Sequence, residues 1–251
     1  MPVRSIGGLM RLIVARNYDE MSRLAADEIA SVISSESEPV LGLATGSSPI
    51  GTYRELVRLF DDGEISFKDV TTFNLDEYVG LDGSHVQSYR YFMNHNLFDH
   101  VDIDRSRTHV PSGVSDDVED ECSRYDLQIE EAGGIDIQLL GIGHNGHIGF
   151  NEPSDIFPKT THEVKLAEST ISANSRLFDS IEDVPRSAVT MGIGTIMAAR
   201  KILLIANGSD KSYIVKKALF DDVTPEVPAS ILQFHPNVIV IADEEAAAKC
   251  I

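Results

Sequence analysis

The residues best suited to chemistry follow a short apolar run near the middle of the chain. Residues 135–142 read IDIQLLGI, which is typical of a strand buried on both faces of a parallel sheet. Four glycines among residues 141–149 then favour a tight turn or the close approach of a ligand. Open α/β sheets bind ligands at the carboxyl ends of such strands. The stretch therefore predicts a functional site, with five polar candidates: His144, Asn145, His147, Asn151 and Glu152.

These side chains favour proton transfer over metal or cofactor binding. His147 is suited to proton exchange near neutral pH, and Glu152 or Asn145 could orient its imidazole. A metal could bind His144, His147 and Glu152, but histidines three residues apart in a glycine loop lack the rigidity of a helical zinc motif. The sequence GIGHNG fits a dinucleotide-binding loop only loosely, and no acidic residue follows at the required distance. We expect neither a metal nor a cofactor; a solvated glycine-rich loop is the alternative interpretation.

Two acidic residues, Asp76 and Glu77, directly follow another predicted strand, which spans residues 70–75. A carboxyl group there would be partly desolvated, which raises its pKa and suits Asp76 to the role of general base. The alternative is that Asp76 or Glu77 caps a turn or a helix.

A third group of residues is typical of an anion-binding turn. Thr45, Gly46, Ser47 and Ser48 follow a predicted strand and precede a helix, with Ser48 expected as the N-cap and Pro49 as the first helical residue. Lys211 at the start of a later helix and Arg176 could donate to a phosphate, although each could equally be a surface charge. A phosphate grip, a carboxylate base and a histidine suit proton abstraction beside a carbonyl or imine, as in sugar phosphate isomerisation.

The elements that must position these groups alternate between strands and helices. This alternation predicts a single-domain, doubly wound, mostly parallel α/β sheet, Rossmann-like, with helices on both faces, and right-handed crossovers would place the candidate turns at one edge. We expect a domain over residues 10–251, a loose prefix over 1–9 and a candidate lid over 154–182 that holds a short strand near 161–168. Strands are predicted at 11–15, 38–45, 70–75, 107–110, 135–142, 201–206 and 238–242, and helices at 18–33, 49–60, 87–98, 117–132, 184–199, 211–219 and the end of the chain.

Charge and composition limit the classes of partner. The 251 residues include 21 basic and 40 acidic ones, a net charge of −19, so neither a nucleic acid nor an anionic membrane is expected to bind. A small anionic substrate needs only a local cluster of donors. Two cysteines and the lack of a long apolar segment or signal peptide predict a cytoplasmic protein.

Six motifs resemble the family of glucosamine-6-phosphate deaminases. They are LGLATGSSPIGTY, TTFNLDEYVGL, LLGIGHNGHIGFNEP, ANSRLF, VPRSAVTMGIGTI and LQFHP, and the similarity runs in order from about residue 10 to residue 245. The resemblance implies an enzyme of amino sugar metabolism that acts without a metal. This enzyme would convert glucosamine 6-phosphate and water into fructose 6-phosphate and ammonia, by aldose–ketose isomerisation with deamination.

The resemblance also implies roles for individual residues. Asp76 matches the base that moves a proton from C2 to C1, His147 the residue that opens the sugar ring, and Glu152 the carboxylate that supports this histidine. Asn145 stands where some members have aspartate, so a His147–Glu152 pair assisted by Asn145 is expected in place of a three-member relay. The phosphate grip would comprise Thr45, Gly46, Ser47, Ser48, Arg176 and Lys211.

The chain ends soon after VIVIADEEAAAK, whereas allosteric hexameric members of the family continue further. We therefore expect an unregulated monomer or small homo-oligomer. The alternatives are a 6-phosphogluconolactonase-like hydrolase, which shares the fold, and a non-catalytic sugar-phosphate sensor.

Overall fold

An eight-stranded sheet forms the centre of the molecule. The computed structural model describes residues 3–6, 10–166, 171, 175, 178 and 180–251. The sheet order is β1-β2-β11-β10-β7-β3-β4-β6, in which β1 pairs antiparallel with β2 and all other pairs are parallel. The doubly wound α/β prediction is confirmed. The strands are β1 Val3–Ile6, β2 Met10–Ala15, β3 Val40–Leu43, β4 Thr71–Asn74, β6 Thr108–His109, β7 Ile137–Leu140, β10 Lys201–Ala206 and β11 Val238–Asp243.

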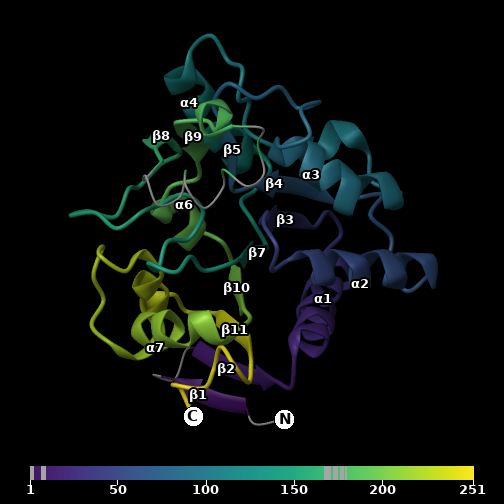
Figure 1. Cartoon of the computed structure of the whole chain (residues 1–251). Coiled ribbons are helices and arrows are strands. Elements are labelled where there is room, and N and C mark those ends of the chain that lie inside the picture. The colour runs from purple at the N-terminus through teal and green to yellow at the C-terminus, as the bar shows by residue number, and fades with distance from the viewer. Residues whose placement is uncertain (1–2, 7–9, 167–170, 172–174, 176–177, 179) are drawn as a thin grey trace.

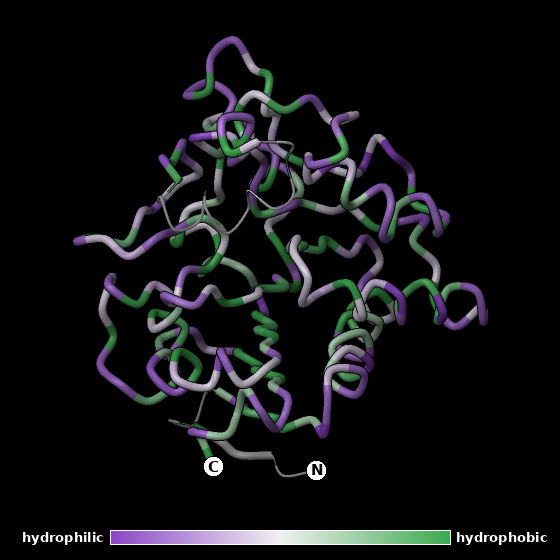
Figure 2. The backbone as a smooth tube through the Cα atoms, viewed as in Figure 1, coloured by the Kyte–Doolittle hydropathy of each residue, from purple (hydrophilic) through white to green (hydrophobic). Residues whose placement is uncertain are grey.

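The central strands are buried because their sequences are apolar on both faces. All six residues of β11 and all four of β7 are buried, and β10 is buried except for its first residue. Figure 2 shows the hydrophobic residues of these strands gathered inside a more hydrophilic outline. Strand β1 corrects the prediction of a loose prefix: four residues at the sheet edge pair with β2, too short a segment to be recognised by periodicity alone.

The order of the strands reverses between β3 and β7. From β3 the chain builds outward through β4 to β6, and from β7 it builds in the other direction through β10 to β11. Loops that follow β3 and β7 therefore diverge to opposite sides at this point and leave a crevice at the carboxyl ends, where doubly wound folds bind their ligands.

Helices cover both faces of the sheet, with α1, α2 and α3 on one side and α7 with the 3₁₀ segment η6 Pro228–Phe234 on the other (Figure 1). Three of the helices begin at polar N-caps, since Asn17, Ser88 and Asp117 each accept a hydrogen bond from a backbone N–H of the first turn. In the described part of the chain, no helix is long and apolar enough to cross a membrane. The α-helices are α1 Tyr18–Ser35, α2 Ile50–Asp61, α3 Tyr89–Asn96, α4 Val118–Glu131, α6 Ile193–Met197 and α7 Ser212–Phe220.

A second, three-stranded antiparallel sheet lies beyond the carboxyl end of β4. Its order is β5 Asp76–Tyr78, β9 Ser187–Thr190 and β8 His162–Lys165. Strand β8 confirms the short strand expected near 161–168. The helix predicted over 184–199 is wrong in its first half, because residues 187–190 form β9 between two partner strands and only Ile193–Met197 is helical. The final helix is also absent, since residues 244–250 form turns.

Candidate active site

The phosphate grip predicted at Thr45–Ser48 lies directly after β3, beside the reversal of strand order. Gly46 has φ +92°, a conformation that favours glycine, and it turns the chain so that Ser47 and Gly46 are exposed at the rim. The Ser48 hydroxyl donates to Asn207 Oδ1 at 2.8 Å. Helix α2 begins at Ile50 after Pro49, so the prediction of Ser48 as N-cap and Pro49 as the first helical residue is wrong by one position. The Ser48 hydroxyl is bonded to Asn207 instead, and the first turn of α2 is capped by the Tyr18 hydroxyl, which accepts the backbone N–H of Gly51 at 2.8 Å.

Lys211 comes to the same rim from the carboxyl end of β10. It ends the 3₁₀ turn η5 Ser209–Lys211 and is half-buried, and this burial lowers the pKa of its amine against the opposing effect of Asp210. The Ser48–Asn207 bond ties the turn after β3 to the turn after β10, which carries Lys211. Asn207 was not recognised in the sequence because nothing local indicates its partner. The predicted donor Arg176 lies outside the described residues.

Asp76 is buried at the start of β5, where its backbone pairs with Thr190 of β9. Burial, with a smaller contribution from the charge of Glu77, raises the pKa of Asp76 to about 8. Among the described residues no side chain or backbone group is hydrogen-bonded to its carboxyl oxygens. The carboxyl group therefore has the environment of a general base with a pKa near the operating pH.

Glu77 is a capping residue, a structural role that the sequence alone could not assign between Asp76 and Glu77. Its carboxylate accepts hydrogen bonds from the backbone N–H groups of Tyr78, Tyr89 and Arg90 at 2.9–3.0 Å. Two of these N–H groups belong to the first turn of α3, so Glu77 caps that helix together with Ser88. The capping alternative therefore holds for Glu77, and Asp76 is left for chemistry.

The loop after β7 brings together an imidazole, a carboxylate and an amide. His147 Nδ1 lies 3.5 Å from Glu152 Oε2, and Asn145 Nδ2 donates to the same carboxylate oxygen at 2.5 Å. The Oδ1 atom of Asn145 accepts the backbone N–H of His147 at 3.2 Å. Asn145 thus orients both members of the pair without accepting a proton itself. This arrangement agrees with the expected His147–Glu152 pair assisted by Asn145.

The loop after β7 comes close to Asp76 at Gly149. A Cβ atom at Gly149 would lie 2.9 Å from Thr190 Oγ1 and 3.6 Å from Asp76 Oδ2, so the loop passes beside the buried carboxyl group. Phe150 N donates to Thr190 Oγ1, and Asn151 Nδ2 donates to the carbonyls of Ile148 and Met191. The polar candidate Asn151 is therefore a structural clamp. The loop that carries His147 is therefore fixed to β9 and passes beside Asp76.

Three aromatic residues, none of them predicted as site residues, pack against one another beside β5: Tyr78, Tyr89 and Phe150. Tyr78 and Tyr89 share a hydroxyl–hydroxyl hydrogen bond of 3.3 Å, and the Tyr89 hydroxyl also bonds the side chain of Thr45. Phe150 packs against both rings, with centroid distances of 5.6 and 6.0 Å. These contacts pack the three rings together between β5, the start of α3 and the loop after β7.

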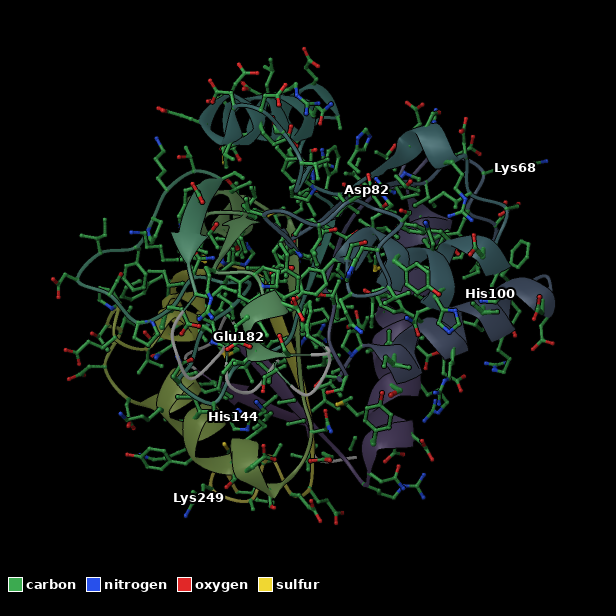
Figure 3. The ribbon with its side chains drawn as sticks, turned by 45° about the horizontal axis from the view of Figure 1, so that its top comes forward. Lys68, Asp82, His100, His144, Glu182 and Lys249 are labelled. Carbon is green, nitrogen blue, oxygen red and sulfur yellow. The ribbon has the colours of Figure 1, made fainter. Side chains whose placement is uncertain are left out.

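His144 points away from this group. Its Nε2 atom lies 2.5 Å from Asp210 Oδ2, and both side chains are exposed. Figure 3 shows His144 on the surface beside the C-terminal part of the chain. In the described part of the chain, no three histidine, cysteine or acidic side chains are grouped as metal ligands would be.

The fold is that of a doubly wound α/β protein whose candidate residues follow β3, β4, β7 and β10, at and beside the reversal of strand order. The family model of glucosamine-6-phosphate isomerases and 6-phosphogluconolactonases matches residues 15–240, and the chain belongs to this family. It is 57% identical to a glucosamine-6-phosphate deaminase of Clostridium perfringens, over 95% of this chain and 98% of that protein. A glucosamine-6-phosphate deaminase of Clostridioides difficile is 55% identical, over 96% of each chain.

Two solved structures place the fold within that family. A monomeric glucosamine-6-phosphate deaminase superposes with a TM-score of 0.92 at 46% identity, over 95% of this chain and 99% of that one. A 6-phosphogluconolactonase of Thermotoga maritima shares the fold with a TM-score of 0.71 at 17% identity, over 94% and 99% of the two chains.

Proposed function

We propose that this protein converts glucosamine 6-phosphate and water into fructose 6-phosphate and ammonia. The observation that carries the proposal is the buried Asp76, whose pKa is raised to about 8, beside the loop that holds the His147–Glu152 pair. The identity of 55–57% to glucosamine-6-phosphate deaminases over nearly the whole chain supports the choice of substrate.

The phosphate of the substrate is assigned to the turns after β3 and β10. Backbone N–H groups near Gly46 and the start of α2, the hydroxyls of Thr45 and Ser47, and the amine of Lys211 provide donors and positive charge around one space. Arg176 remains a predicted further donor. Anchored there, the sugar extends toward β7 and β5.

Ring opening is assigned to His147. Its imidazole takes the proton of the C1 hydroxyl and returns a proton to the ring oxygen, which breaks the C1–O5 bond and leaves an open-chain aldehyde. The neighbouring Glu152 stabilises the charged imidazolium that forms in between, and Asn145 holds Glu152 in place.

Isomerisation and deamination follow at Asp76. In its ionised form the carboxylate removes the C2 proton while the C1 oxygen takes a proton from the substrate's ammonium group, which gives an enolamine; Asp76 then returns its proton to C1, which leaves an iminium at C2. Water adds to that carbon, the C2–N bond breaks, and ammonia leaves as the ketone forms.

Ammonia release by the purified protein tests this proposal. We expect ammonia and fructose 6-phosphate in equal amounts from glucosamine 6-phosphate, with hyperbolic kinetics that N-acetylglucosamine 6-phosphate does not change. As a further proposal, the protein acts in the cytoplasm and is an unregulated enzyme. Its likeness to a monomeric relative supports the lack of regulation, and hyperbolic kinetics follow from it. Hydrolysis of 6-phosphogluconolactone without ammonia would indicate the hydrolase, binding without turnover would indicate a sensor, and a sigmoidal curve relieved by the acetylated sugar would contradict the unregulated enzyme.

The exposed His144–Asp210 pair offers a prediction of small effect. The His144 and Asp210 side chains are 72% and 58% exposed, and ion pairs between exposed groups contribute about 0–1 kcal/mol. We therefore expect His144→Ala to change kcat and KM by less than about fivefold. A hundredfold loss of kcat would show that His144 belongs to the catalytic group.

A further inference from the structure

The turn after β10 carries Lys211 of the proposed grip and Asn207, which is bonded to Ser48 of the grip, and it has an unusual backbone conformation. Gly208 stands between Asn207, which accepts from Ser48, and Lys211, and it has φ +91° and ψ 150°. Residues other than glycine rarely adopt this conformation. Something must hold the chain there if Asn207 and Lys211 are to face the crevice together.

Asp243 provides that restraint from the neighbouring strand. It ends β11, whose residue Ala242 pairs with Ala206 of β10, and its side chain is only 7% exposed. Both carboxylate oxygens lie 3.1 Å from the backbone N of Gly208, and Oδ1 also accepts the N–H of Ala246 at 2.8 Å. One buried carboxylate thus fixes the turn after β10 and the turn after β11.

We propose that Asp243 is a positioning residue for phosphate binding, acting through Gly208. Held by the carboxylate, Gly208 directs Asn207 toward Ser48 and sets the start of η5, so the two turns of the grip keep their spacing. This inference rests on the proposed function, since it assigns the phosphate to that grip. It adds a residue that lies outside the grip itself and contacts neither the base nor the imidazole in the described structure.

Three variants of Asp243 separate positioning from stability. In Asp243→Ser, the shorter hydroxyl can still accept from Ala246, a role serine fills well at the start of a turn, but it cannot also hold Gly208. In Asp243→Asn, one amide oxygen can still accept from both N–H groups. Asp243→Ala removes both contacts.

Asp136 supplies a matched control at the opposite end of the sheet. It is 8% exposed, accepts the backbone N–H of Val40 at 2.8 Å and pairs with Arg200, so Asp136→Ala also removes a buried carboxylate that holds backbone. Asp136 lies at the amino end of β7, whereas the grip lies at the carboxyl ends of β3 and β10.

The readout is the dissociation constant for inorganic phosphate, measured by calorimetry, with the melting temperature recorded for each variant. We expect Asp243→Ser and Asp243→Ala to weaken phosphate binding at least tenfold, Asp243→Asn less than threefold, and Asp136→Ala not at all although it lowers the melting temperature. In turnover, Asp243→Ser should raise KM with kcat changed less than threefold. Unchanged phosphate binding in folded Asp243→Ser, or an equal loss in Asp136→Ala, would overturn the inference. Phosphate binding is measured without turnover, so this test does not depend on the proposed reaction. If the wild type released no ammonia, the proposed reaction would be refuted, but the effect of Asp243 on phosphate binding could still be measured.

Discussion

Asp76→Asn is expected to lower kcat by about a hundred- to ten-thousandfold, the usual contribution of a general base. The amide has nearly the shape of the carboxyl group, so β5 and the grip should keep their places and the substrate should still bind. The specific readout is exchange of the C2 hydrogen with deuterated solvent, which should cease. Continued exchange at the wild-type rate would show that another group removes this proton.

The same substitution should stabilise the fold, and more so at higher pH. Burial and the nearby charge of Glu77 raise the pKa of Asp76 to about 8 in the native state, whereas an unfolded aspartate titrates near about 4. The native state therefore binds the proton more tightly than the unfolded chain. The associated stability is fully present below about pH 4 and is lost as the pH rises to about 8.

Asparagine is neutral throughout that range and has no such loss. The melting temperature of Asp76→Asn should thus exceed that of the wild type by about 5 °C or more at pH 8, with a smaller difference at pH 4. Asp221→Asn, at an exposed position paired with Lys216, serves as the control and should show no such trend. Parallel stability curves for the wild type and Asp76→Asn would contradict the assigned burial of charge.

Gly143→Ala should reduce kcat nearly as much as His147→Gln, about a hundredfold or more. A Cβ atom at residue 143 would lie 2.2–2.4 Å from three atoms of the His147 ring, well inside contact distance. The imidazole must move away from this position, and its 3.5 Å approach to Glu152 is then lost. Ring opening should slow while substrate binding at the grip is retained.

Gly141→Ala is the matched control, because a Cβ at Gly141 would meet open space two residues earlier in the same loop. It should keep kcat within about twofold. The readout is the rate with the ring-closed substrate, compared with binding of fructose 6-phosphate. If both alanine variants lose activity equally, the loop backbone and not the position of the imidazole sets the rate.

The strands, the helices and the main catalytic candidates could be predicted because their signals are local. Continuous apolar runs predict β7, β10 and β11, and polar residues in the segments after β4 and β7 make Asp76 and His147 candidates for chemistry. The local sequence predicts a helix at residues 187–190, but these residues form strand β9 because they pair with β5, which lies more than a hundred residues away. The sequence carries no sign of that pairing.

Residues that act through distant partners were missed for the same reason. Asn207 and Asp243 are ordinary polar residues at strand ends until the sheet places them beside Ser48 and Gly208. Ser48 looked like an N-cap because its local sequence is that of one, but its hydroxyl bonds Asn207 across the crevice. Glu77 and Asp76 could not be told apart without the position of α3, whose N–H groups select Glu77.

The pairing of Asp76 with Thr190 sets a condition on how the protein becomes active during its synthesis. Strand β9, which pairs with β5 in the folded protein, leaves the ribosome long after β5 itself. A nascent chain synthesised as far as Glu152 already holds Asp76, His147 and Glu152 but still lacks β9, so we expect its Asp76 carboxylate to be open to water and to titrate as an ordinary acid. Catalytic competence should therefore arise late, in one step, when the C-terminal third docks.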